Sequence, residues 1–207
     1  MVMPDTGRTR RAGGAQRIAV LEAVVGVLAE RGYENTRFAD VAAAAGVAIS
    51  TLQNYFGSRE DMLIEAMRYA SHCERELLER LAAGEPKPWN RLVALVDRSL
   101  STPLNVQIAM LEFWRCGIRD PEIREYGTEM WNNYSRAFVH TISDGIEDGV
   151  FTTPNRPEDV VELLLRTLSG ALFPRVLGFP ARSIKRFRQV LLADLAASLN
   201  VGNAGKK

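Results

Sequence analysis

The sequence contains few of the residues on which several classes of protein depend. Its two cysteines, Cys73 and Cys116, lie far apart and form no CxxC pair, which argues against a disulfide-stapled secreted scaffold and against a structural zinc site. Its two histidines are His72 and His140, and His72 with Glu76 one turn later supplies at most two metal ligands. No G-x-S-x-G motif and no phosphate-binding glycine loop occurs. We therefore expect no enzyme, no metal ion and no cofactor.

Long apolar runs and an excess of charge of one sign are also absent. No segment has the roughly 18 consecutive apolar residues of a membrane span, and the N-terminal MVMPDTGRTRRAGGAQR is followed by no signal-like stretch. The sequence therefore predicts a cytoplasmic protein without a membrane partner. The net charge is +1, whereas nucleic-acid binding more often accompanies a strongly basic domain.

Apolar residues recur with a helical period along nearly the whole chain, and no run of strict alternation favours a sheet. The sequence therefore predicts an all-α fold. We expect Gly32 and Gly46 to stop two helices, Thr36 to act as an N-cap, and Ser58 with Asp61 to form a capping box. The predicted helices span 16–31, 37–45, 49–56, 58–81, 121–147, 157–177 and 181–199, and a further one starts at Pro103.

The first 17 residues concentrate positive charge, since four arginines face the single acidic residue Asp5. Such an arm suits contact with a DNA backbone or minor groove, and it equally suits simple exposure to solvent, so both interpretations stay open. The arginines are Arg8, Arg10, Arg11 and Arg17.

Residues 37–56 have the spacing of a helix-turn-helix motif. Two short helices are joined by a tight turn at Gly46, and Val47 and Leu52 are expected to fill the corner between them. Polar side chains that suit phosphates or base edges dominate the second helix. They are Ser50, Thr51, Gln53, Asn54 and Tyr55, followed by Arg59. The same geometry also serves as plain packing in helical proteins, so the spacing alone leaves that alternative open.

The longer run GYENTRFADVAAAAGVAISTLQNYFGSREDML resembles the DNA-binding segment of the TetR family of repressors. The resemblance implies phosphate contacts and base readout for two sets of positions. The phosphate set is Thr36, Thr51, Asn54, Tyr55 and Arg59, and the base-reading set is Arg37, Ala48, Ser50 and Gln53. Ala48 stands where the family usually has a capping Ser, Ser50 where it often has Gly, and Gln53 where it often has Tyr. A helical protein-interaction module that has lost DNA binding is the alternative that these departures support.

The helix after Pro103 and its successor bring together an aromatic set that suits a small organic ligand. The predicted ligand-binding residues are Gln107, Met110, Phe113, Trp114, Trp131, Tyr134 and Phe138. Ordinary core packing is the alternative for each of them. Glu112 beside tryptophan rings suits a cation, and the segment from Phe113 to Pro121 resembles the choline-responsive subgroup of the family.

The last two predicted helices carry broad apolar faces that suit either a protomer core or a four-helix dimer interface. The family resemblance implies a homodimer, in which two recognition helices about 34 Å apart read a palindrome in double-stranded operator DNA. It also implies a repressor that a small-molecule effector releases. With a boundary at AAGEPKPWN, the predicted domains are a disordered arm (1–15), a DNA-binding domain (16–82), a ligand-binding and dimerisation domain (83–201) and a disordered tail (202–207).

Overall fold

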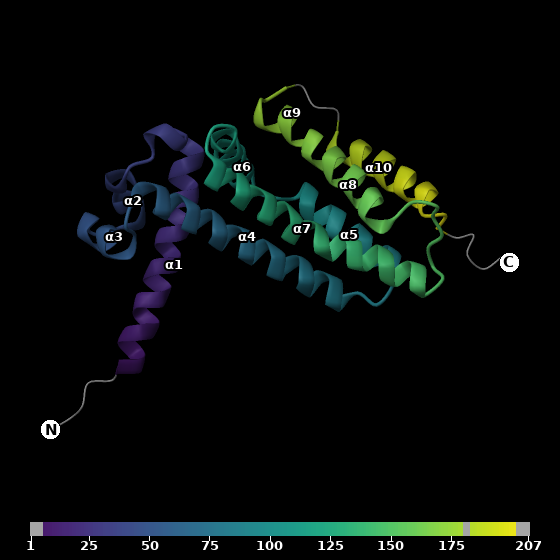
Figure 1. Ribbon diagram of the computed structural model, residues 1–207, viewed down its shortest axis with the longest axis horizontal. Helices are drawn as coiled ribbons and strands as arrows, with labels where there is room; N and C mark the ends of the chain where they lie inside the picture. The colour runs from purple at the N-terminus through teal and green to yellow at the C-terminus, as the bar shows by residue number, and fades with distance from the viewer. Residues whose placement is uncertain (1–5, 180–182, 202–207) are drawn as a thin grey trace. The chain divides into compact units, whose positions relative to one another are not determined.

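A computed structural model describes residues 6–179 and 183–201, with side chains from residue 14 onward. All regular structure in these ranges is helical (Figure 1), which confirms the predicted all-α fold. The elements are α1 (Thr6–Arg31), the 3-10 turn η1 (Tyr33–Asn35), α2 (Phe38–Ala45), α3 (Ile49–Tyr55), α4 (Arg59–Gly84), α5 (Pro88–Leu100), α6 (Leu104–Gly117), α7 (Pro121–Glu147), α8 (Pro157–Gly170), α9 (Leu172–Val176) and α10 (Ile184–Ser198).

The chain forms two compact units. The first unit combines Met1–His72 with Ile108–Gly127, and the second combines Cys73–Gln107 with Thr128–Lys207. Helices α4, α6 and α7 therefore each contribute residues to both units. The compact units are not divided between residues 82 and 83, where the sequence predicts a domain boundary. That boundary concerns functional domains and stays a prediction.

In the first unit, α1 contacts α2 and α2 contacts α3. Buried apolar side chains on one stripe of each helix close the core between them. They include Val24 and Leu28 of α1, Val41 of α2, Leu52 of α3 and Leu63 of α4. Gly46 ends α2 in the left-handed conformation (φ 65°, ψ 34°), so the chain turns sharply into α3 as the sequence predicts.

Several helix ends differ from the prediction for local reasons. Thr36 was expected as the N-cap of α2, but that position is Arg37, and the Thr36 hydroxyl donates instead to the carbonyl oxygen of Gly32. Helix α1 begins at Thr6, so residues 6–15 are helical where a disordered arm is predicted. Residues 1–5 and 202–207, which hold the rest of the predicted arm and the whole predicted tail, lie outside the described residues.

The predicted Ser58 cap agrees with the structure, and Asp120 forms a further cap. The backbone N–H of Asp61 donates to Ser58 Oγ at 2.9 Å, which is one of the two hydrogen bonds of a capping box. Asp120 caps α7, because its Oδ1 accepts hydrogen bonds from the backbone N–H groups of Glu122 and Ile123. Short polar side chains at these positions satisfy backbone donors that have no partner inside the helix.

The second unit has a core shared by α5, α7, α8 and α10. Its buried residues are Leu78, Leu92, Leu95, Val96, Phe138, Ile142, Phe151, Val160, Val161, Leu164, Leu165, Leu191, Leu195 and Leu199. The predicted helix 157–177 is divided into α8 and α9. Most of the apolar faces that the sequence assigns to the last two helices are therefore used inside the protomer, which is one of the two alternatives left open above.

Candidate functional site

Helix α3 presents a polar surface and buries its apolar side. Ser50, Gln53 and Asn54 are exposed, Thr51 and Tyr55 are half-buried, and Leu52 is fully buried against the rest of the first unit. Figure 1 shows α3 directly after α2, and the left-handed residue Gly46 ends α2. An exposed polar helix face beside a short, rigid turn has the form of a helix presented to a DNA groove.

The start of α3 lacks the side-chain cap that many helices have. Ala48 is the N-cap residue, in an extended conformation (φ −72°, ψ 147°), and makes no side-chain hydrogen bond to the helix. The first N–H groups of a helix have no partner inside it, and a phosphate can accept from them. Exposed Arg37 lies at the corresponding position of α2.

The end of α3 is held by α1. The Tyr55 hydroxyl donates to Gln16 Oε1 at 3.0 Å, and the Arg17 guanidinium lies 5.4 Å from the ring centroids of both Tyr55 and Phe56. Arg17 also donates from Nε to Glu65 at 3.0 Å. Arg17, which the sequence groups with the basic arm, is therefore engaged within the first unit, and Tyr55 is oriented before any phosphate approaches.

Two of the predicted phosphate contacts have internal partners instead. Thr36 is fully buried, so its hydroxyl does not reach the surface. Arg59 donates from Nη1 to the carbonyl oxygens of Tyr33 and Thr36, and its guanidinium lies 4.7 Å from the centroid of the Tyr33 ring. Burial raises the pKa of Tyr33, and the Arg59 charge opposes that rise. Both residues stabilise the loop between α1 and α2.

Positive charge on the first unit comes from arginine, since the first lysine of the chain is Lys87. Among the described side chains before residue 67, three arginines have acidic partners and exposed Arg37 is in no ion pair. The pairs are Arg17 with Glu65, Arg31 with Asp40 and Arg59 with Glu60. Arg37 is thus well placed for an external phosphate or base.

The predicted ligand-binding residues divide between the two units. In the first unit Phe113 is fully buried and packs edge-to-face on Tyr126, with ring centroids 5.7 Å apart, while Met110 and Trp114 are half-buried. In the second unit the set is Gln107, Trp131, Tyr134 and Phe138. Phe138 belongs to the buried core, and Trp131 and Tyr134 pack against it.

Two polar residues of the predicted ligand-binding set, Tyr134 and Gln107, differ in their hydrogen bonding. Tyr134 shares a hydrogen bond of 2.6 Å with Ser99, and burial raises the pKa of Tyr134 to about 12. Gln107 is buried, and its Oε1 has no hydrogen-bond partner among the described residues. An unsatisfied buried amide oxygen is rare and suits a donor group brought by a ligand.

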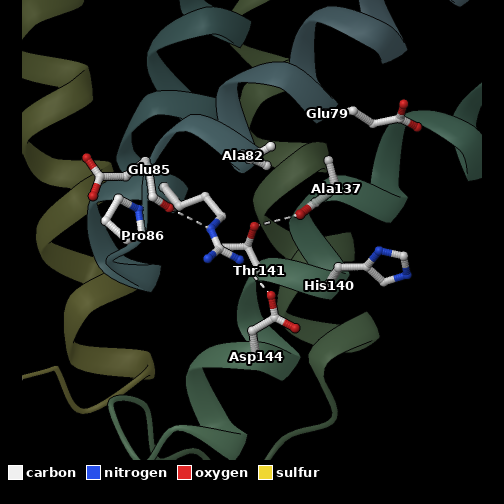
Figure 2. A pocket seen from close by; sticks show the side chains of 10 residues that line it. Glu79, Ala82, Glu85, Pro86, Ala137, His140, Thr141 and Asp144 are labelled. Carbon is white, nitrogen blue, oxygen red and sulfur yellow. Dashed lines mark hydrogen bonds and ion pairs between the residues drawn. The ribbon is translucent and has the colours of Figure 1, made fainter.

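A hollow of about 310 Å³ opens in the second unit and is distinct from the predicted ligand set (Figure 2). Its walls come from the end of α4, the start of α5 and the later part of α7. Arg91 lines this hollow and donates a hydrogen bond from Nη1 to Asp144 at 2.6 Å. Glu79, Glu85 and His140 also line it, and none of the predicted ligand-binding residues does.

Glu112 of α6 is engaged within the first unit. Its Oε2 accepts a hydrogen bond from the backbone N–H of Tyr33 at 3.1 Å and lies 3.2 Å from Arg115 Nη2. This contact joins residues 79 positions apart, and the sequence pattern, which suggests Glu112 for a ligand cation, gives no signal for it. The partners Gln16 and Glu65 around α3 were missed for the same reason, because polar residues on separate helices show no periodic pattern.

Both cysteines are half-buried free thiols. Cys73 belongs to the second unit and Cys116 to the first. Burial raises the pKa of the Cys116 thiol, and the neighbouring Arg115 charge opposes that rise. No helix in the described part of the chain is long and apolar enough to span a membrane.

Comparison with known proteins matches both the motif and the fold. Residues 20–66 match the sequence model of the bacterial regulatory proteins of the tetR family. The chain is 30% identical over 118 residues to the HTH-type transcriptional regulator BetI of Burkholderia mallei, an alignment that covers 53% of this chain and 58% of BetI. It is 24% identical over 139 residues to the fatty acid metabolism regulator protein of Bacillus subtilis, covering 63% of this chain and 68% of that protein.

Solved structures extend the fold match along most of the chain. A putative transcriptional regulator from Saccharomonospora viridis, solved in complex with choline, superposes with a TM-score of 0.78 at 25% identity and covers 89% of this chain and 96% of its own. FadR from Bacillus subtilis, solved with stearoyl-CoA, gives a TM-score of 0.74 at 21% identity and covers 87% of this chain and 97% of its own, which shows the shared fold alone. Residues 20–66 therefore match the tetR family of bacterial regulatory proteins, and most of the chain shares the fold of solved transcriptional regulators.

Proposed function

We propose that the protein is a cytoplasmic repressor that binds a palindromic operator as a homodimer and is released from it by a small organic effector. The observation that carries the proposal is the exposed polar face of α3, supported from behind by buried Leu52 and by the left-handed turn at Gly46. This face lies within the segment that matches the tetR family.

The DNA contacts divide between base edges and phosphates. Ser50 and Gln53 are exposed on α3 and are proposed to read bases, because Gln can pair with the adenine edge and a hydroxyl can pair with several edges. Thr51, Asn54 and Tyr55 are proposed to bind phosphates, and exposed Arg37 to bind either. Ala48 contributes through the free backbone N–H groups that follow it. Thr36 and Arg59 hold the preceding loop and act on DNA only indirectly.

A dimer interface is proposed on the outer faces of α8 and α10. Their inner faces fill the core of the second unit, yet Leu163 of α8 and Val190 of α10 are 65% and 55% exposed. Exposed Ala193 and Ala197 continue the Val190 face along α10 and allow close helix approach. Two copies paired there form a four-helix interface.

The effector is proposed to bind in the second unit, where Gln107 offers an unpartnered acceptor and Trp131 and Tyr134 are partly buried. The relatives differ in ligand, since one structure holds choline and another stearoyl-CoA. Choline and stearoyl-CoA are therefore both suitable first probes. Glu112 already binds Tyr33 and Arg115, so it is not a free counter-ion for a cationic ligand.

The test is a footprint of the purified full-length protein on the DNA flanking its own gene at low salt. We expect the wild-type protein to protect one palindrome, and we expect Gln53→Ala to lose this protection. Arg37→Ala should bind more weakly, and the slope of its log affinity against log salt concentration should be smaller by about one. Glu22→Ala, an exposed change on α1, is the matched control. Each probe is then added separately, and release identifies its class.

Protection of no site at low salt would overturn the proposal. The result would favour the alternative of a helical protein-interaction module that uses the same surface of α3. Equal protection of all sequences would retain DNA binding but remove the operator from the proposal.

A further inference from the structure

The loop of residues 32–36, which leads into the helix-turn-helix, is under unusual backbone constraint. Gly32 has φ 75° and ψ 167°, a conformation that is essentially restricted to glycine. The Thr36 hydroxyl closes the loop by donating to the Gly32 carbonyl oxygen at 2.8 Å. Helix α2 then begins at Phe38, so the path of this short loop sets the direction of α2 and, through the turn at Gly46, of α3.

Helix α6 holds the loop by a single carboxylate. Glu112 Oε2 accepts a hydrogen bond from the Tyr33 N–H at 3.1 Å, and a Cβ atom added to Gly32 would lie 3.2 Å from the same oxygen. The carboxylate therefore lies closer to Gly32 than most side chains at this position would permit. Hydrogen bonds to a charged acceptor are about twice as strong as neutral ones, and Arg115 at 3.2 Å helps to fix this carboxylate.

Helix α4 binds other polar groups of the same loop. Arg59 donates to the carbonyl oxygens of Tyr33 and Thr36 and stacks over the Tyr33 ring. The N–H of Tyr33 is thus fixed by α6, whereas its carbonyl oxygen is fixed by α4. The two helices act on opposite ends of one residue.

We propose that Glu112 is a positioning residue for DNA binding, because its hydrogen bond to Tyr33 fixes the loop from which α2 and α3 take their direction. This proposal rests on the proposed function and adds to it a residue outside the helix-turn-helix on which operator affinity depends. Glu112 and the loop belong to the same compact unit.

The test compares Glu112→Ala with Glu112→Gln in the full-length protein. Glu112→Ala should speed hydrogen exchange at the Tyr33 amide and lower the affinity for the footprinted operator, each by about tenfold, since one charged hydrogen bond is lost. Glu112→Gln keeps an acceptor oxygen and should restore most of both. Exchange is measured by NMR or by mass spectrometry of peptides that span residues 32–36.

The matched control is Ile123→Val, which removes one methyl group from a buried site of the same unit and leaves the Glu112 carboxylate unchanged. It should lower stability and leave DNA affinity and Tyr33 exchange unchanged. An unchanged Tyr33 exchange rate in Glu112→Ala would overturn the proposal. It would also be overturned if Glu112→Ala and Ile123→Val both lost DNA affinity in proportion to their loss of stability. If the wild-type protein binds no DNA, the proposed function fails separately, and Tyr33 exchange still decides whether Glu112 holds the loop.

Discussion

At the scale of single residues, two glycines in the first unit have opposite roles. Gly32 has a positive φ and meets the Glu112 carboxylate, whereas Gly26 lies inside α1 with open space where a Cβ would stand. The conformation at position 32 requires glycine, whereas glycine at position 26 only lowers the stability of the helix.

Gly32→Ala should lower the free energy of unfolding by about 2 kcal/mol, because alanine strains the backbone at this conformation. Gly26→Ala should raise it by about 0.5–1 kcal/mol through better helix propensity. Urea unfolding of both variants beside wild type measures these changes. Equal effects at the two sites would show that the Gly32 conformation carries no special cost.

Tyr134 gives the fold a dependence on high pH. Burial raises its pKa to about 12, whereas an unfolded tyrosine titrates near about 10. Between these values the unfolded chain loses the proton that the native state keeps, so stability present below about pH 10 is lost as the pH rises toward about 12, by up to about 3 kcal/mol.

Tyr134→Phe should remove this part of the pH dependence, and it should cost about 1 kcal/mol at neutral pH because the hydrogen bond with Ser99 is lost. Urea unfolding between pH 8 and pH 11.5, values chosen as roughly bracketing the titration, provides the measurement. Identical slopes for the variant and wild type would assign the alkaline loss of stability to other groups.

Sequence reasoning was accurate for residues whose partners are close in the chain. Ser58 and Gly46 act within their own turns, and local capping rules identify them. Thr36 was assigned the wrong role, because its hydroxyl bonds backward to Gly32 rather than forward into α2. Arg59 and Glu112 depend on which helices meet, and no local rule contains that information.

At the scale of elements, most of the helices were predictable, because amphipathic periodicity is strong and glycine and proline mark the ends. Helix α5 (Pro88–Leu100) was not predicted. The predicted α7, residues 121–147, agrees with the structure at both bounds. Helix α1 is longer than expected at its N-terminus, and one predicted helix is divided into α8 and α9. The apolar faces were predicted correctly, but whether a face packs into the protomer core or against a partner depends on the packing of the whole unit.

Helix α3 has a capping position that alanine leaves unused. Ala48 already has the extended conformation of an N-cap, so Ala48→Ser should add a hydrogen bond to the first turn and raise the free energy of unfolding by about 1 kcal/mol. Ala44→Ser, at an exposed position inside α2, is the control and should lower it by about 0.5 kcal/mol. Thermal unfolding of both variants measures the difference, and destabilisation by Ala48→Ser would contradict the assignment.

At the scale of the whole molecule, the division into two units separates the surface proposed for DNA from the surface proposed for dimerisation. The family match covers residues 20–66 of the first unit only. Function in the first unit was therefore predictable from a specific motif. The effector was not, because its predicted aromatic residues also serve as ordinary core: Phe113 and Phe138 are both fully buried.

Val190→Glu should convert the dimer to a monomer, because it introduces an unpaired charge into the proposed apolar interface of α10. Sedimentation velocity gives the oligomeric state, and the palindromic footprint should be lost with the dimer. Ile118→Glu is the matched control, since Ile118 is 73% exposed and belongs to the first unit. A Val190→Glu variant that remains dimeric would exclude this face.

The two native thiols provide a means to follow the units without engineering the chain. Cys116 reports on the first unit and Cys73 on the second. Because burial raises the pKa of Cys116, less of it is thiolate near neutral pH, and maleimide dyes or spin labels should attach to it slowly. A label on either thiol therefore reports on its own unit, so operator binding and effector release can each be assigned to the unit whose signal changes.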